Sequence, residues 1–450
     1  MIGLNKIGLN QVQLNRLRLN APFPAYGKMA GGGGSGDGFP QLPGDVTRWH
    51  FGGLTNEMMA AMDDPRLEDA DGKGRFLSFK NFAWKEGSGI SDVYPGALVF
   101  DGVDDCGVCE NFPILTKEKG YTVVVLRQWD QDFLNTTLTG GLLSTRNYST
   151  GEGVAFEKIE SSNKGYWNLG AGGIIDFAKS PFTWQTSKQY NNVGILKGDK
   201  NHGKPLCVGC GLSGGQQCGR FAIWELVFLD HDATEEELTK IKDYFVKTYP
   251  WLFPDQAWTV VGKTNEDEDR ATIANITGNG NDLVCLNLGF IEGSGYNEEG
   301  EYAGYLVTDG VDDKITSSTF EMGNDWTVIG DWELINTGKN DNAGIVKFDS
   351  IVIYNYNSIL INIKNGRNNL IPDQNTVNAI CSDGRIYSKD WKESIYNEET
   401  ESTSKNLLTI GYSGNSYTKI AFKNLAIYPT VLSKEDCIKA YNYLQTLKAK

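Results

Sequence analysis

The chain has 450 residues, of which 40% are hydrophobic and 22% charged, and its formal net charge at pH 7 is -15. This ordinary globular composition has room for roughly two or three domains, and the acidic balance argues against binding nucleic acid or an anionic membrane. The lack of an apolar run near the roughly 18–20 residues of a membrane span argues against membrane insertion. The eight cysteines are too dilute for a disulfide scaffold. No secretory signal is evident at the N-terminus, which predicts synthesis in a cytoplasm.

Residues 1–20 form a short repeat with a period of five, in which the apolar residues of each unit lie two positions apart. Spacing of two is typical of a strand, and such a segment has no core of its own to cover its apolar face. We expect an edge strand or anchor that docks on another chain, with a disordered leader as the alternative. The apolar positions are Ile2, Leu4, Ile7, Leu9, Val12, Leu14, Leu17 and Leu19.

Residues 21–38 contain two prolines, Pro22 and Pro24, followed by a glycine-rich run from 31 to 38. This composition predicts a flexible linker with a reach of roughly 25 Å.

The rest of the chain repeats itself, which indicates two tandem domains at 39–254 and 255–450. Five sequence blocks return in the same order at a separation of about 200 residues, far longer than a solenoid unit. The paired blocks are 49–57 with 258–266, 72–74 with 278–280, 86–89 with 292–295, 101–105 with 309–313, and 220–226 with 419–425.

Each predicted domain consists mainly of strands and ends in one helix. Runs rich in β-branched and aromatic residues predict the strands, which lie at 97–100, 121–126, 221–229, 305–308, 326–329 and 420–428. Thr234 with Glu237, and Ser433 with Asp436, match or approach the capping-box pattern of a helix start. We therefore predict an all-β fold of two antiparallel β-sandwiches, each closed by a short C-terminal helix.

Two stretches resemble the laminin-G-like, concanavalin A-like jelly-roll family. They are ALVFDGVDD at 97–105 and FKNLAIYPTVLSKEDCIKAY at 422–441, and the turn at 275–282 is similar to one near the start of that fold. The resemblance covers nearly all of residues 45–450 and implies two tandem jelly rolls. It is specific for the fold and says little about activity.

Residues 110–124 and 262–273 are similar to virion proteins of crass-like phages that infect Bacteroides-type bacteria. This resemblance implies a structural virion protein, such as a head fibre or tail appendage, located in the virion. Residues 1–20 would then dock on other virion proteins, and the chain would assemble as a homo-oligomer, expected to be a trimer. Host glycans are the expected ligands, although no ligand residue follows from the resemblance. A free or cell-surface carbohydrate-binding module is the alternative, and such a protein would normally carry a signal peptide.

The chain offers little for catalysis, and we expect neither an enzyme nor a cofactor. Retaining glycosidases need two carboxylates about 5–5.5 Å apart, usually supplied by one strand. The acidic run at 266–269 lacks strand-forming residues and is expected to be a solvated loop. The three histidines, His50, His202 and His231, have no nucleophile motif nearby.

Cysteines form two Cys-x-x-Cys pairs, Cys106 with Cys109 and Cys207 with Cys210. Four thiolates could hold one tetrahedral zinc ion if the pairs met. Residues three apart on a strand face opposite sides, however, and the second repeat has no cysteines in these places. We favour buried free thiols that pack as small hydrophobes.

Acidic turns are the candidates for calcium. Residues 69–74 resemble the start of an EF-type loop, but Lys80 occupies the position of its distal glutamate. A second candidate occurs in both repeats and consists of Asp101, Asp104 and Asp105 with their equivalents Asp309, Asp312 and Asp313. We favour tight turns whose aspartates bond the local backbone.

Aromatic side chains could stack on sugars. Those in strand-like runs are expected in the core, and they are Trp84, Trp224, Trp326 and Trp332. The candidates in loop-like surroundings are Tyr166, Trp167 and Trp391.

Overall fold

The computed structural model of this chain describes residues 38–113, 120–134, 136–145, 155–158, 164–168, 174–176, 193–197, 205–212, 216–335, 343–348, 351–355, 359–363, 369–371, 377–395, 406–413 and 416–449. The predicted anchor and all but the last residue of the predicted linker lie outside these segments. None of the described helices is both long and apolar enough to cross a membrane.

The described strands of the first repeat form two sheets. One has the order β12-β7-β16-β5-β4, with β1 also on β16, and comprises β1 (Val46–His50), β4 (Gly89–Ile90), β5 (Leu98–Asp101), β7 (Thr122–Trp129), β12 (Val193–Lys197) and β16 (Arg220–Leu229). The other sheet has the order β11-β10-β9-β8-β13-β6-β3-β2, and a hairpin of β14 and β15 lies beside β8. Its strands are β2 (Arg66–Glu68), β3 (Phe76–Lys80), β6 (Cys106–Cys109), β8 (Gly140–Ser144), β9 (Ala155–Lys158), β10 (Lys164–Asn168), β11 (Ile174–Asp176), β13 (Leu206–Val208), β14 (Cys210–Leu212) and β15 (Gln216–Cys218).

The second repeat has the same plan. Its first sheet has the order β20-β21-β34-β23-β28-β29-β30, with β17 on β34, and comprises β17 (Gln256–Thr259), β20 (Gly295–Tyr296), β21 (Leu306–Val307), β23 (Thr327–Leu334), β28 (Val377–Cys381), β29 (Arg385–Ser388), β30 (Glu393–Ile395) and β34 (Ile420–Tyr428). Its second sheet has the order β18-β19-β22-β31-β24-β25-β26-β27 and comprises β18 (Thr272–Ile273), β19 (Leu283–Leu286), β22 (Lys314–Phe320), β24 (Ala343–Phe348), β25 (Ile351–Asn355), β26 (Ile359–Ile363), β27 (Asn369–Ile371) and β31 (Asn406–Ile410). A small hairpin pairs β32 (Tyr412–Ser413) with β33 (Ser416–Tyr417).

The central strands correspond between the repeats. Trp49 on β1 pairs with Leu226 on β16, and Trp258 on β17 pairs with Leu425 on β34. The prediction of an all-β fold with two antiparallel sandwiches, each closed by a helix, is confirmed.

Strand β7 is buried on both faces, which explains the apolar run from Val123 to Leu126 within it. Val123 and Val125 point into the core between the two sheets, whereas Val124 and Leu126 belong to a second core on the other face. Alternate side chains of a strand face opposite sides, so a stretch of strand covered by apolar cores on both faces favours apolar residues at successive positions.

The helices after β16 and β34 begin where the capping patterns predict. In α4 (Glu235–Thr248), the Thr234 hydroxyl accepts a hydrogen bond from the Glu237 amide, and the Glu237 carboxylate accepts one from the Thr234 amide. In α5 (Lys434–Leu444), the Ser433 side chain accepts a hydrogen bond from the Asp436 amide. Two shorter helices are α2 (Asn56–Ala60) and α3 (Gln131–Leu134), and a 3-10 turn, η3 (Pro250–Leu252), follows α4.

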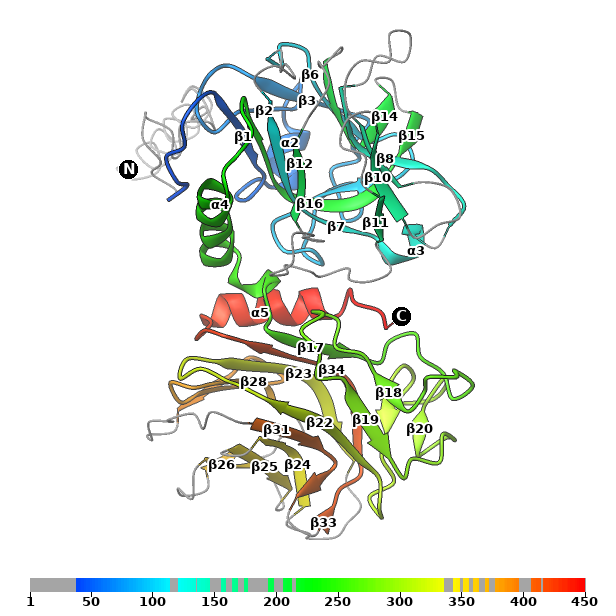
Figure 1. Cartoon of the computed structure of the whole chain (residues 1–450). Helices are drawn as coiled ribbons and strands as arrows, with labels where there is room; N and C mark the ends of the chain where they lie inside the picture. The colour runs from blue at the N-terminus through cyan, green and yellow to red at the C-terminus, as the bar shows by residue number, and fades with distance from the viewer. Residues whose placement is uncertain are drawn as a thin grey trace, which may run out of the picture.

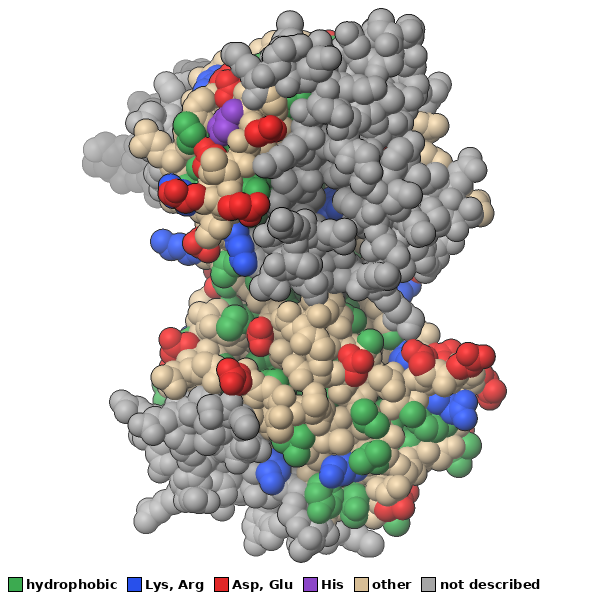
Figure 2. Space-filling model, viewed as in Figure 1, with side chains coloured by type: hydrophobic (Ala, Val, Ile, Leu, Met, Phe, Trp, Pro, Cys, Tyr) green, Lys and Arg blue, Asp and Glu red, His purple; other side chains and the backbone are tan. Residues whose placement is uncertain are grey.

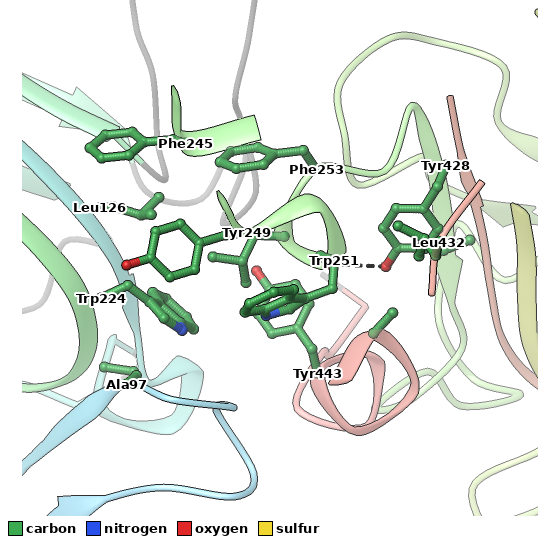
Figure 3. Close-up of a cluster of buried hydrophobic side chains, with 14 of the residues drawn as sticks. Ala97, Leu126, Trp224, Phe245, Tyr249, Trp251, Phe253, Tyr428, Leu432 and Tyr443 are labelled. Carbon is green, nitrogen blue, oxygen red and sulfur yellow. Dashed lines mark hydrogen bonds between the residues drawn. The ribbon is translucent and has the colours of Figure 1, made fainter. Parts of the chain in front are cut away.

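The two sandwiches share one buried core, with η3 and α5 between them (Figure 1). Trp224 of β16 meets Tyr443 of α5 with ring centroids 6.2 Å apart, and the Tyr428 hydroxyl of β34 donates to the Trp251 carbonyl at 3.0 Å (Figure 3). Aromatic pairs of this kind contribute beyond the area that they bury. The terminal helices therefore fasten the two repeats to each other as well as closing each sandwich.

Candidate functional site

Three of the repeated sequence blocks converge on one rim in each sandwich. In the first repeat, the Asn56 side chain both accepts a hydrogen bond from the Ile90 amide and donates one to the Ile90 carbonyl, each at 2.7 Å. In the second, Asn265 makes the same pair of bonds with Tyr296, each at 2.8 Å. We call the loop at 81–90 and its equivalent at 287–296 the aromatic loops.

Each aromatic loop is hydrogen-bonded to an aspartate turn, which we define as residues 101–105 and 309–313. The Ser88 hydroxyl donates to an Asp105 carboxylate oxygen at 3.0 Å, and the Ser294 hydroxyl donates to Asp313 at 2.8 Å. The repeated serines and aspartates thus serve the same contact in both domains, which accounts for their recurrence in the sequence.

The aspartate turns use their carboxylates on their own backbone, as predicted. Asp101 accepts the Val103 amide at 2.7 Å, and Asp105 accepts the Asp101 amide at 3.0 Å. Burial raises the pKa of Asp105 to about 7, and burial also raises the pKa of Asp313. The three carboxylates of each turn lie close enough together to face one cation, but their observed bonds are those of a closed turn.

Apolar and aromatic groups are presented beside these carboxylates. Val103 and Val311, at the tips of the two aspartate turns, are each 71% exposed. Trp84 and Phe290 hold equivalent places in the aromatic loops, with φ angles of 48° and 51°. Positive φ strains a bulky residue, and such conformations concentrate at functional sites. Figure 2 shows hydrophobic side chains among acidic and basic ones over the β18–β20 side of the second sandwich.

Trp84 corrects the expectation that it lies in a core strand. It follows β3 in the half-buried aromatic loop and stacks on Phe82, with ring centroids 5.0 Å apart. Phe290 stacks on Tyr296 at 6.2 Å, and the Arg270 guanidinium lies 5.3 Å from the centre of the Phe290 ring. The other three tryptophans expected in the core are buried; they are Trp224, Trp326 and Trp332.

The aromatic candidates in loop-like surroundings gain no support as ligand residues. Trp391 packs against Tyr441 at 5.7 Å and Tyr387 at 6.2 Å, so its ring contributes to the shared core. The side chains of Tyr166 and Trp167 lie outside the described part of the chain.

The EF-like segment at 69–74 is also a turn. The fully buried Asp69 carboxylate accepts hydrogen bonds from the amides of Lys73 at 3.1 Å and Arg75 at 2.8 Å. These bonds place the Asp69 carboxylate against its own backbone, as favoured from the sequence.

The four cysteines considered as zinc ligands do not form one set. Cys109 points into the sandwich core, whereas Cys106, Cys207 and Cys210 lie in a separate buried cluster. Cys210 forms a disulfide with Cys218, which corrects the expectation that Cys210 is a free thiol. Cys106, Cys109 and Cys207 are free and buried, as expected, and Cys285, Cys381 and Cys437 are free and buried as well.

A buried network around Glu225 escaped the sequence analysis. The carboxylate accepts hydrogen bonds from the hydroxyls of Tyr244 at 2.8 Å and Tyr249 at 3.0 Å. Arg48 lies 3.4 Å and His50 lies 2.9 Å from its oxygens. Burial raises the pKa of Tyr249, so its hydroxyl stays protonated as a donor. These residues come from β1, β16, α4 and the turn that follows it, so the network docks the helix on the sheet.

The described histidines contact structural carboxylates. His50 belongs to the Glu225 network, and His231 lies 3.0 Å from the capping residue Glu237. His202 lies outside the described residues. The acidic run at 266–269 forms turns at the surface, as predicted.

No family model matches the chain, and no curated protein matches its sequence. Among solved structures, Trypanosoma rangeli sialidase is similar with a TM-score of 0.32 and 8% identity, covering 84% of this chain and 68% of that one. The binding domain of botulinum neurotoxin serotype D is similar with a TM-score of 0.30 and 9% identity, covering 80% of this chain and 94% of that one. The same values hold for that domain in complex with N-acetylneuraminic acid. At these scores the likeness carries no argument about activity or ligand.

Proposed function

We propose that this chain is a non-enzymatic structural protein of a bacteriophage particle, a head fibre or similar appendage, which displays two lectin-like sandwiches. The observation that supports this proposal is the buried core shared by both repeats, built around Trp224, Trp251 and Tyr443. Such a core holds the two sandwiches in one relative placement, whereas the default between domains is relative motion. A fixed body suits a protein that projects its surfaces from a particle.

Attachment is assigned to residues 1–20. Their apolar residues at strand spacing match the mode in which an extended segment adds to a sheet edge of another protein. Other virion proteins are the proposed partners, and three copies of the chain would bring three such segments together. The glycine-rich run at 31–38 would then let the sandwiches move relative to the particle.

The two rims are the proposed contact surfaces for decoration or weak adhesion to host glycans. Each offers an aromatic ring, Trp84 or Phe290, on a loop fastened to an aspartate turn. Ligand sites combine apolar and aromatic surface with a few polar groups that fix orientation. Two equivalent rims on one body would gain from avidity on a repetitive glycan surface.

Light scattering behind gel filtration tests the attachment proposal on the full chain and on a shortened chain that starts at Phe39. We expect the full chain to be trimeric and the shortened chain to be monomeric. Two clean monomers would count against an assembly anchor and would favour the free carbohydrate-binding module.

A glycan array tests the rims. We expect weak binding by the wild-type chain, reduced in Trp84→Ala and in Phe290→Ala and lowest when both are combined, because each rim is one of two equivalent sites. Trp391→Ala is the matched control, since its partly buried ring packs against the shared core and not on a rim. Binding that is unchanged in the combined variant would remove the rims from the proposal.

A further inference from the structure

Four cysteines of the first repeat form a small buried cluster of their own. Cys106, Cys207, Cys210 and Cys218 pack together with Val108, and this cluster is separate from the core between the sheets. Its position follows from strand geometry, because Cys106 and Val108 share the face of β6 opposite to Cys109. Four sulfur atoms are thus gathered from four strands, β6, β13, β14 and β15.

The strand register brings the sulfur atoms together in two pairs. Cys207 on β13 lies opposite Val108 on β6, which makes Cys106 its diagonal neighbour, and the two thiols are hydrogen-bonded. Cys210 on β14 lies directly opposite Cys218 on β15, and these two are joined by a disulfide.

A tight turn links the two pairs. Residues 207–210 run from β13 to β14 through Gly209, which has a φ of 96°. A Cβ atom at Gly209 would lie 2.3 Å from the Phe100 ring and 2.6 Å from the Asp105 carbonyl, so only glycine fits. The Cys210 backbone amide donates to the Cys207 sulfur. A Cys-x-x-Cys turn with such an amide bond is suited to holding both sulfurs on one ion.

We propose that the reduced protein binds one zinc ion through Cys106, Cys207, Cys210 and Cys218. A dithiol reductant supplies two electrons and two protons to the Cys210–Cys218 bond, which breaks into two thiols as the reductant closes to its own disulfide. The four thiols then lose four protons as their thiolates bind the metal, completing the four-sulfur set of structural zinc sites.

Binding requires the sulfurs of the reduced disulfide to move toward the other two thiols. Tetrahedral zinc with Zn–S bonds of about 2.3 Å places its sulfurs about 3.8 Å apart. The hydrogen-bonded thiols of Cys106 and Cys207 are already neighbours, so the released sulfurs of Cys210 and Cys218 make the larger move. Lys80 lies opposite Cys106 in the strand register, and its positive charge would offset part of the negative charge of a four-thiolate site. The negative charges of Asp104 and Asp105 act on Cys106 in the opposite direction.

Packing alone does not require sulfur at these places. The second repeat has the same sheet, but its corresponding residues at 314–317 and 410–413 include no cysteine. Cys109 and Cys285, in contrast, are single buried thiols within the two sandwich cores, where a thiol packs as a small hydrophobe. These two residues are therefore matched controls for the cluster.

Metal analysis of the full chain, produced with added zinc and purified with dithiothreitol, tests the proposal. We expect about one zinc per chain in the wild type. The zinc should be lost in Cys207→Ala and in Cys218→Ala and retained in Cys109→Ala and Cys285→Ala. Cobalt loaded in place of zinc should give the intense visible bands of a tetrahedral thiolate site.

The wild-type measurement decides the proposal even where a variant fails to fold. Reduced wild-type protein that carries no zinc after incubation with it, and shows no cobalt–thiolate bands, would overturn the proposal. So would peptide mapping that finds Cys210 and Cys218 still linked after purification with the dithiol. Zinc retained in the folded Cys218→Ala variant would likewise exclude the four-sulfur set.

Discussion

Replacing Trp251 with alanine tests whether the shared core couples the two sandwiches. The side chain is 6% exposed and packs between Tyr249, with ring centroids 5.5 Å apart, and Lys439, whose ammonium lies 4.5 Å from the ring centre. Burying about 150–250 Å² at about 25 cal/mol per Å² corresponds to about 4–6 kcal/mol, and measured Trp→Ala changes in cores cost about 3–5 kcal/mol. We therefore expect Trp251→Ala to lower the free energy of unfolding by about 4 kcal/mol.

Denaturant unfolding and calorimetry measure this loss of stability and show whether the two sandwiches unfold together or separately. The wild-type sandwiches should unfold in one transition, because each buries apolar surface against the other. Trp251→Ala should separate that transition into two, since η3 no longer fills the space between β16 and α5.

Trp84→Ala is the matched control, because it removes the same side chain from a rim rather than from the shared core. It should lower stability while leaving a single transition. A Trp251→Ala chain that unfolds in one transition and loses less than about 1 kcal/mol would refute the coupling argument.

Three further changes probe local features. Glu225→Ala leaves Arg48 buried without its carboxylate partner and should cost about 3–5 kcal/mol in denaturant unfolding; a loss under about 1 kcal/mol would contradict the network. The pKa of Asp105 in the folded state, about 7, lies above its ordinary value of 3.8, so its contribution to stability is present at low pH and falls as pH rises from about 4 to 7. Unfolding midpoints across that range should fall more in the wild type than in Asp105→Asn, which keeps only the contribution of Asp313; identical profiles would argue against the raised pKa of Asp105. Thr234→Ala removes the cap of α4 and should cost about 0.5–2 kcal/mol, and an unchanged melting temperature would disprove the role of the cap.

The amino-acid sequence was sufficient for the features that depend on neighbouring residues. Runs of β-branched residues predicted the central strands, and the spacing of Thr234 and Glu237 predicted the start of α4. The repeated blocks predicted two copies of one sandwich, because equivalent residues return in the same order. The strands and the helix start rest on interactions within a few residues, so local spacing is enough to predict them.

The tertiary structure decided which distant residues meet. Local spacing grouped Cys109 with Cys106. Side chains alternate between the two faces of β6, however, so Cys109 points into the core. The register of β14 with β15 places Cys218 in the cysteine cluster instead. The Glu225 network likewise joins β1 to residues about 200 positions away, and no motif marks it.

Two further features also depend on which distant residues meet. They are the convergence of the repeated blocks on one rim and the core shared by both sandwiches. Both depend on sheet order and on the faces that packing leaves uncovered. A sequence read along the chain shows which residues recur, whereas only the folded sheets determine which of them are brought into contact.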